Sequence, residues 1–186
     1  MDPGAPKARK EFILRDAGCK NVLTTKNKAE DFPTAQDVTI IPVDVDDWQS
    51  LSSEKPTLSR ELVPQDTCYC LYTSGTTGTP KGCLISHESA VQAMLAFQRI
   101  FKGRWNDSSR WLQFASFHFD VSVLEQYWSW SVGICVTSAP RDLLFEDFPG
   151  TIRALKITHL DLTPSLARLL TPDDVPSLCQ GVFIVG

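Results

Sequence analysis

One run of sequence carries most of the information in this chain: Tyr72-Thr73-Ser74-Gly75-Thr76-Thr77-Gly78-Thr79-Pro80-Lys81-Gly82. This glycine-rich run follows an apolar segment, residues 68–72, that predicts a buried strand. Glycine has no Cβ and can adopt positive φ, so its backbone can approach a ligand closely. Backbone N–H groups, hydroxyls and one lysine charge can together surround a polyphosphate. We therefore predict a phosphate-binding loop rather than an ordinary mobile turn.

The most general phosphate motif, G-x-x-x-x-G-K-S/T, does not fit this run. Counting from Gly75, the second glycine should stand directly before the lysine, but Pro80 occupies that position. The residue after the lysine should be Ser or Thr, which would bind Mg²⁺, but it is Gly82. The glycine-rich run is therefore not a Walker A loop.

The unbroken match from Thr73 to Gly82 resembles the signature loop of the adenylate-forming enzymes. These are acyl-CoA synthetases, luciferases and the adenylation domains of nonribosomal peptide synthetases. The resemblance implies that the loop holds the β- and γ-phosphates of ATP, with Mg²⁺ assisting. The residues that it assigns to ATP binding are Thr73, Ser74, Gly75, Thr76, Thr77, Gly78, Thr79 and Lys81.

A second motif, Phe119-Asp120-Val121-Ser122, precedes a segment with a helical pattern. From the residues alone, Asp120 is equally well explained as the N-cap of that helix. In peptide-synthetase adenylation domains, however, the aspartate of a Phe-Asp-x-Ser motif binds the α-amino group of the substrate. Acyl-CoA synthetases and luciferases generally lack this aspartate. The resemblance therefore implies an amino-acid substrate that is bound by Asp120.

The same resemblance also assigns residues to the pocket for the substrate side chain. These positions are Val121, Leu124, Asp161, Phe183 and Val185. An unpaired buried carboxylate is costly, so Asp161 predicts a substrate with a polar or basic side chain. The pocket order Asp, Val, Leu, Asp is similar to that of fungal siderophore synthetases of the ferrichrome type, which activate acylated N-hydroxyornithine.

The reaction implied by the resemblance is attack of an amino-acid carboxylate on the α-phosphate of ATP. It gives an aminoacyl-adenylate and pyrophosphate, and then a thioester on the phosphopantetheine of a carrier protein. Catalysis of such a transfer is mainly positioning and charge neutralisation. The expected partners are the peptidyl carrier and condensation domains of a multidomain synthetase. We expect no catalytic side chain in this chain, because the family's catalytic lysine lies in a C-terminal subdomain beyond it.

The resemblance makes residues 1–186 the middle portion of an adenylation domain. The chain stops on an apolar strand pattern, residues 183–186, where a natural domain seldom ends. We expect a fragment that lacks the start of the domain, the adenine- and ribose-binding part and the C-terminal subdomain, and that is inactive alone. Two alternatives remain open: an acyl-CoA synthetase-like ligase, against which Asp120 argues, and a non-catalytic truncated remnant.

Composition excludes several other classes of function. A net charge of −4 argues against a general nucleic-acid or anionic-membrane partner. No apolar stretch approaches the roughly 20 residues that span a bilayer, and the N-terminus lacks a signal peptide, so a cytoplasmic location is the default. The six cysteines form no C-x-x-C pair, so we expect structural thiols and no metal site. Cys68 and Cys70 are expected to be buried on one face of a strand.

Strand and helix patterns alternate along the chain. Helices are predicted at residues 7–17, 87–101, 121–130, 148–155 and 164–170, and strands at residues 21–24, 38–43, 68–73, 82–85, 134–137, 157–162 and 182–185. Such alternation predicts an α/β fold with a largely parallel sheet flanked by helices. The resemblance implies that this sheet is part of the N-terminal core of an adenylate-forming enzyme.

Overall fold

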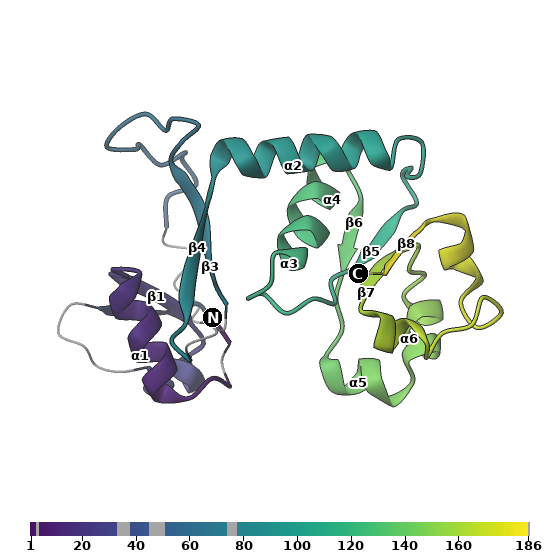
Figure 1. The fold of residues 1–186 in the computed structure, drawn as a ribbon, viewed down its shortest axis with the longest axis horizontal. Coiled ribbons are helices and arrows are strands. Elements are labelled where there is room, and N and C mark those ends of the chain that lie inside the picture. Colours follow the sequence, from purple (N-terminus) through teal and green to yellow (C-terminus); the bar gives the residue numbers. More distant parts are fainter. Residues whose placement is uncertain (3, 33–37, 45–50, 74–77, 186) are drawn as a thin grey trace. The chain divides into compact units, whose positions relative to one another are not determined.

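The chain divides into two units, residues 1–86 and residues 87–186. The computed structural model describes residues 1–2, 4–32, 38–44, 51–73 and 78–185, and Figure 1 draws their helices and strands. No helix in these ranges is long and apolar enough to cross a membrane.

In its described residues, the first unit carries one α-helix, one 3-10 helix and two pairs of strands. Its elements are α1 (Lys7–Asp16), β1 (Asn21–Thr24), the 3-10 helix η1 (Lys26–Asp31), β2 (Thr39–Pro42), β3 (Thr67–Thr73) and β4 (Lys81–Ser86). β1 and β2 are parallel, whereas β3 and β4 are antiparallel. Helix α1 buries Ile13 and Leu14 and ends before Gly18, whose φ of +61° places it in the region that glycine favours. The predicted stop at Gly18 is therefore confirmed.

The β3–β4 hairpin is more exposed than its sequence predicts. Among the described residues, β3 has β4 as its strand partner, and none of its residues is fully buried. The expectation of a buried strand with buried thiols is therefore wrong: Cys68 and Cys83 are exposed, and Cys70 is half-buried. The physical reason is that a two-stranded sheet leaves much of both faces uncovered.

The second unit is built around a parallel sheet. Its strands are β5 (Arg110–Leu112), β6 (Cys135–Thr137), β7 (His159–Leu162) and β8 (Val182–Val185), in the order β6-β5-β7-β8. Its helices are α2 (His87–Ile100), α5 (Arg141–Glu146), α6 (Phe148–Ala154), α7 (Pro164–Ala167) and the 3-10 helix η4 (Pro176–Gln180). A further helical stretch is composed of α3 (Val121–Val123), the π turn η3 (Leu124–Trp128) and α4 (Ser129–Ser131). The predicted α/β class is confirmed.

Apolar clusters cover both faces of this sheet, because neighbouring residues of a strand point to opposite faces. Leu112 of β5 belongs to a cluster with residues of α5, α6 and β7, among them Leu144 and Ile152. The adjacent Trp111 belongs to a second cluster with Trp128 of η3, against which Phe101, the residue after α2, packs. The strands of this unit are therefore fixed between helices on either side (Figure 1).

Candidate substrate pocket

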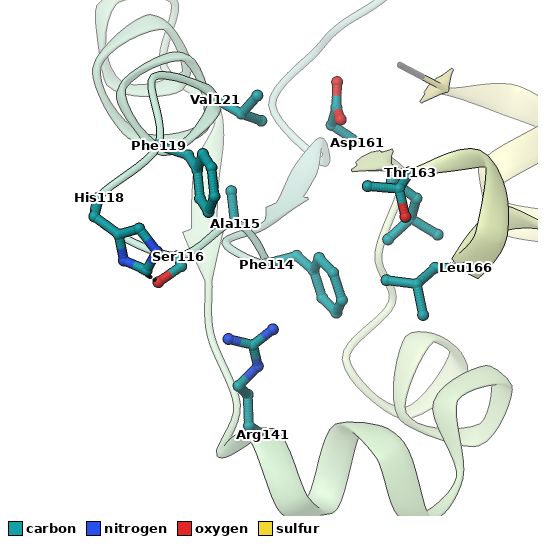
Figure 2. A pocket seen from close by; sticks show the side chains of 11 residues that line it. Phe114, Ala115, Ser116, His118, Phe119, Val121, Arg141, Asp161, Thr163 and Leu166 are labelled. Atoms are coloured by element: carbon teal, nitrogen blue, oxygen red, sulfur yellow. Dashed lines mark hydrogen bonds between the residues drawn. The ribbon is translucent and has the colours of Figure 1, made fainter. Parts of the chain in front are cut away.

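A pocket of about 400 Å³ lies in the second unit, where strands β5 and β7 end. The chain leaves β5 toward β6 on one side of the sheet and then returns to β7 on the other side. Ligands of open parallel sheets bind beyond the carboxyl ends of strands at such a reversal of strand order. The lining residues are Phe114, Ala115, Ser116, His118, Phe119, Val121, Arg141, Asp161, Leu162, Thr163 and Leu166 (Figure 2).

Most of the pocket surface is apolar, and two charged side chains stand out in it. Asp161, near the end of β7, is half-buried, and burial raises the pKa of its carboxyl above the ordinary value. Arg141, the first residue of α5, lies over the rings of Phe114 and Phe145, with its guanidinium carbon 6.0 and 5.9 Å from their centroids. Figure 2 shows Arg141 and Asp161 on different sides of the Phe114 ring. The pocket therefore offers a cation and an acid on an aromatic and aliphatic surface.

The segment that leaves β5, residues 113–116, forms one wall of the pocket and is called the exit segment below. The Gln113 N–H donates to Thr137 O at 2.8 Å, which ties the segment to β6. The carboxylate of Glu125, fully buried in η3, accepts hydrogen bonds from the N–H groups of Phe114 at 3.1 Å and Ala115 at 3.0 Å. Burial raises the pKa of Glu125 to about 7, although these N–H groups act in the opposite direction.

The structure brings two of the predicted substrate residues, Val121 and Asp161, into this pocket. Leu124 is buried instead in the cluster of Trp111 and Trp128 and is not among the lining residues.

Asp120 is exposed and is likewise not among the residues that line the pocket. Its Oδ1 accepts a hydrogen bond from the N–H of Val121 at 3.0 Å. Asp120 therefore caps the start of α3, as the residues alone allow, and its predicted contact with a substrate amine stays a prediction.

The other two predicted pocket residues lie on β8. Phe183 and Val185 pair with Leu160 and Leu162 of β7, which places their backbone beside the strand that carries Asp161. Their side chains lie outside the described part of the chain.

The glycine-rich run connects β3 and β4 in the first unit. Thr73 ends β3 and pairs with Lys81, the first residue of β4, and Gly78 has a φ of +81°. Residues 74–77, which contain the predicted ligands Ser74, Gly75, Thr76 and Thr77, lie outside the described residues. The assignment of Thr73, Gly78, Thr79 and Lys81 to ATP also stays a prediction.

Gly82 has a steric reason to be glycine. A Cβ on Gly82 would lie 3.1 Å from Cζ of Tyr72 and 3.2 Å from Sγ of Cys70. The Tyr72 hydroxyl donates to Asp16 Oδ2 at 2.6 Å, and burial together with this hydrogen bond raises the pKa of Tyr72. The tyrosine ring is thus held across the position of the glycine.

Sequence reasoning did not single out Arg141 or Glu125. Arg141 follows Pro140 shortly after the predicted strand at residues 134–137, and a charged residue just beyond a parallel strand is the signal that points to it. Glu125 carries no such local signal, because its partners lie 10 to 12 residues away.

The model of the AMP-binding enzyme family matches residues 1–182. The whole chain is 63% identical to part of Nonribosomal peptide synthetase 2 of Cochliobolus heterostrophus and 47% identical to part of a hydroxamate-type ferrichrome siderophore peptide synthetase of Schizosaccharomyces pombe. It spans 4% of the length of each. A crystal structure of the nonribosomal peptide synthetase FmoA3 matches 91% of this chain and 18% of its own, with a TM-score of 0.77 and 25% identity.

Proposed function

The chain belongs to the family of AMP-binding enzymes, and we propose that it is part of an adenylation domain. This domain activates an amino acid with ATP and loads the aminoacyl group onto a carrier-protein phosphopantetheine in nonribosomal peptide synthesis. The observation that carries the proposal is sequence similarity: the whole chain is 63% and 47% identical to parts of two such synthetases. The proposed partners are peptidyl carrier and condensation domains of one long synthetase, acting in the cytoplasm.

In this proposal the glycine-rich run binds the β- and γ-phosphates of ATP. Its described residues offer backbone N–H groups, the hydroxyls of Thr73 and Thr79 and the exposed ammonium of Lys81. These groups can bind phosphate oxygens, and the run contains no Asp or Glu that would offer a carboxylate to Mg²⁺. When bound with ATP, Mg²⁺ neutralises charge on the phosphates. Lys81 adds a fixed positive charge there.

The substrate in this proposal is an amino acid with a long side chain that carries a polar group. Asp161 offers an acceptor to that group, and the phenyl and leucyl side chains offer a surface to an apolar part. Asp120, at the start of α3, would take the α-ammonium group. An acylated N-hydroxyornithine has a polar side-chain group, an apolar part and an α-ammonium group, which agrees with the siderophore synthetase among the relatives.

Amino-acid-dependent pyrophosphate exchange by the intact synthetase tests this function. We expect exchange with acylated N-hydroxyornithine, weaker exchange with ornithine, and little with leucine. Exchange with leucine but not with ornithine derivatives would remove the substrate proposal. Activation of a carboxylic acid without an α-amine, and of no amino acid, would instead overturn the proposed function.

A further inference from the structure

Glu125 is a buried acid directly behind the pocket. Its side chain is 0% exposed, yet it forms no ion pair with any residue that the structure describes. A buried carboxylate without a cation is costly, so such a group persists only where hydrogen bonds satisfy it. The partners of Glu125 therefore indicate what it does.

Within the described part of the chain, the partners that hydrogen-bond to this carboxylate all belong to the exit segment. Oε1 accepts from Phe114 N at 3.1 Å and from Ala115 N at 3.0 Å. Oε2 accepts from Ala115 N at 3.0 Å and from Gln113 Nε2 at 3.2 Å. Gln113 Nε2 also donates to Ala115 O, so the side chain of Gln113 links the carboxylate to the carbonyl of the same segment. Two of these residues, Phe114 and Ala115, line the pocket.

The geometry favours the ionised form of Glu125. Both oxygens face donors, so a proton on either oxygen would point at an N–H group and displace it. Burial acts in the opposite sense and brings the pKa of Glu125 to about 7. The charged group that acts on it from β7 is Asp161, which also raises this pKa. Both forms of Glu125 are therefore accessible near neutral pH, and they differ in how well they hold the exit segment.

We propose that Glu125 is a positioning residue: its carboxylate fixes the exit segment as a wall of the pocket, and binding of the amino-acid side chain depends on it. The inference rests on the proposed function of this pocket. Glu125 itself does not line the pocket, so it acts through Phe114 and Ala115. Protonation of Glu125 releases these two N–H groups and lets the wall shift.

The test compares Glu125→Gln with Glu146→Gln in the intact synthetase, measured by pyrophosphate exchange. Glu146 is exposed at the end of α5, so its variant makes the same chemical change without burial. The amide introduced by Glu125→Gln would turn its NH₂ group toward a donor and lose a charged acceptor. Hydrogen bonds to charged groups are strong enough to support an increase of about tenfold or more in the KM for the amino acid. The KM for ATP stays within about twofold, because none of the hydrogen-bond partners of Glu125 is among the residues proposed to bind the phosphates.

The pH profile separates positioning from a general structural role. In the wild type, the KM for the amino acid falls from about pH 6 to about pH 8 as Glu125 loses its proton. In Glu125→Gln the part of this fall that Glu125 causes is lost, and only the contribution of Asp161 remains. Glu125→Asp keeps the charge with a shorter reach and gives an intermediate KM and a sloping profile. An unchanged KM for the amino acid, or equal increases in the KM for both substrates, would overturn the proposal.

Hydrogen exchange in the wild-type synthetase tests the same proposal should the Glu125→Gln variant fail to fold. Amides of a peptide that spans Phe114 and Ala115 lose protection as the pH falls from about 8 to about 6, after correction for the intrinsic rate. A peptide from α6 keeps its protection under the same conditions. Equal protection of the exit segment at both pH values would exclude the positioning role. Absence of amino-acid-dependent exchange in the wild type would instead refute the proposed function.

Discussion

The glycine-rich run and the substrate pocket are held by very different scaffolds. The run connects two antiparallel strands that remain largely exposed, whereas the pocket lies at the end of a parallel sheet with apolar clusters on both faces. The described residues of the run offer backbone N–H groups, two threonine hydroxyls and one lysine charge. The pocket offers side chains on a rigid frame. The difference indicates that binding of phosphate, which is the same for every substrate, needs few buried side chains. Discrimination among amino-acid side chains needs a well-packed pocket.

The largest effect should come from the only charge in the glycine-rich run. Lys81→Ala lowers kcat/KM for ATP by about a hundredfold, because a fixed charge at the phosphates is lost. Pyrophosphate exchange by the intact synthetase measures it. Lys20→Ala, which removes an exposed lysine from the same unit, is the control and leaves exchange unchanged. Normal exchange by the Lys81 variant would show that the run does not bind ATP through this residue.

A smaller and more selective effect is expected in the pocket. Asp161→Asn keeps the size of the side chain and removes its charge, so kcat/KM for a substrate with a polar side chain falls by about tenfold. The KM for ATP is unaffected. Asp173→Asn, at an exposed position, serves as the control. If the Asp161 variant used polar and aliphatic amino acids in the wild-type ratio, Asp161 would have no part in specificity.

The smallest effect concerns the hairpin itself. Gly82→Ala places a Cβ 3.1 Å from the Tyr72 ring, and overpacking of this size costs about 1 kcal/mol of stability. Faster proteolysis within residues 67–86 of the synthetase reports the loss. Tyr72→Ala in the same background removes the ring and restores resistance. Equal proteolysis of the wild type and the Gly82 variant would show that the hairpin adjusts freely.

The sequence predicted those features that depend on neighbouring residues. The helix at residues 7–17 and its stop at Gly18 follow from local pattern, and so do the strands near residues 21–24 and 134–137. The α/β class follows from their alternation. The glycine-rich run is also a contiguous signal, although its contact with ATP remains to be tested.

Features that depend on packing between distant segments were not predicted. Cys68 was expected to be buried because its strand is apolar, but burial depends on how many strands flank it. Arg141 lines the pocket from the start of α5, a helix that was not predicted from the sequence pattern. Leu124 was assigned to the pocket by the resemblance, yet in the structure it lies in the π turn η3 and is buried in the cluster of Trp111. These outcomes depend on the fold and not on the local sequence.

The reversal of strand order between β5 and β7 has a consequence for protein engineering. The described residues that line the pocket lie in one continuous stretch, residues 114–166. The two predicted pocket positions Phe183 and Val185 follow it on β8, and the glycine-rich run lies outside both. Exchange of a segment that holds both sets of positions between related synthetases would therefore carry specificity from one to the other without altering the run. The graft should begin at α2, because Met94, Phe97 and Phe101 pack against the cluster that supports β5. It should end after Val185, so that it includes both predicted positions on β8 as well as Leu178, a buried residue of the opposite cluster.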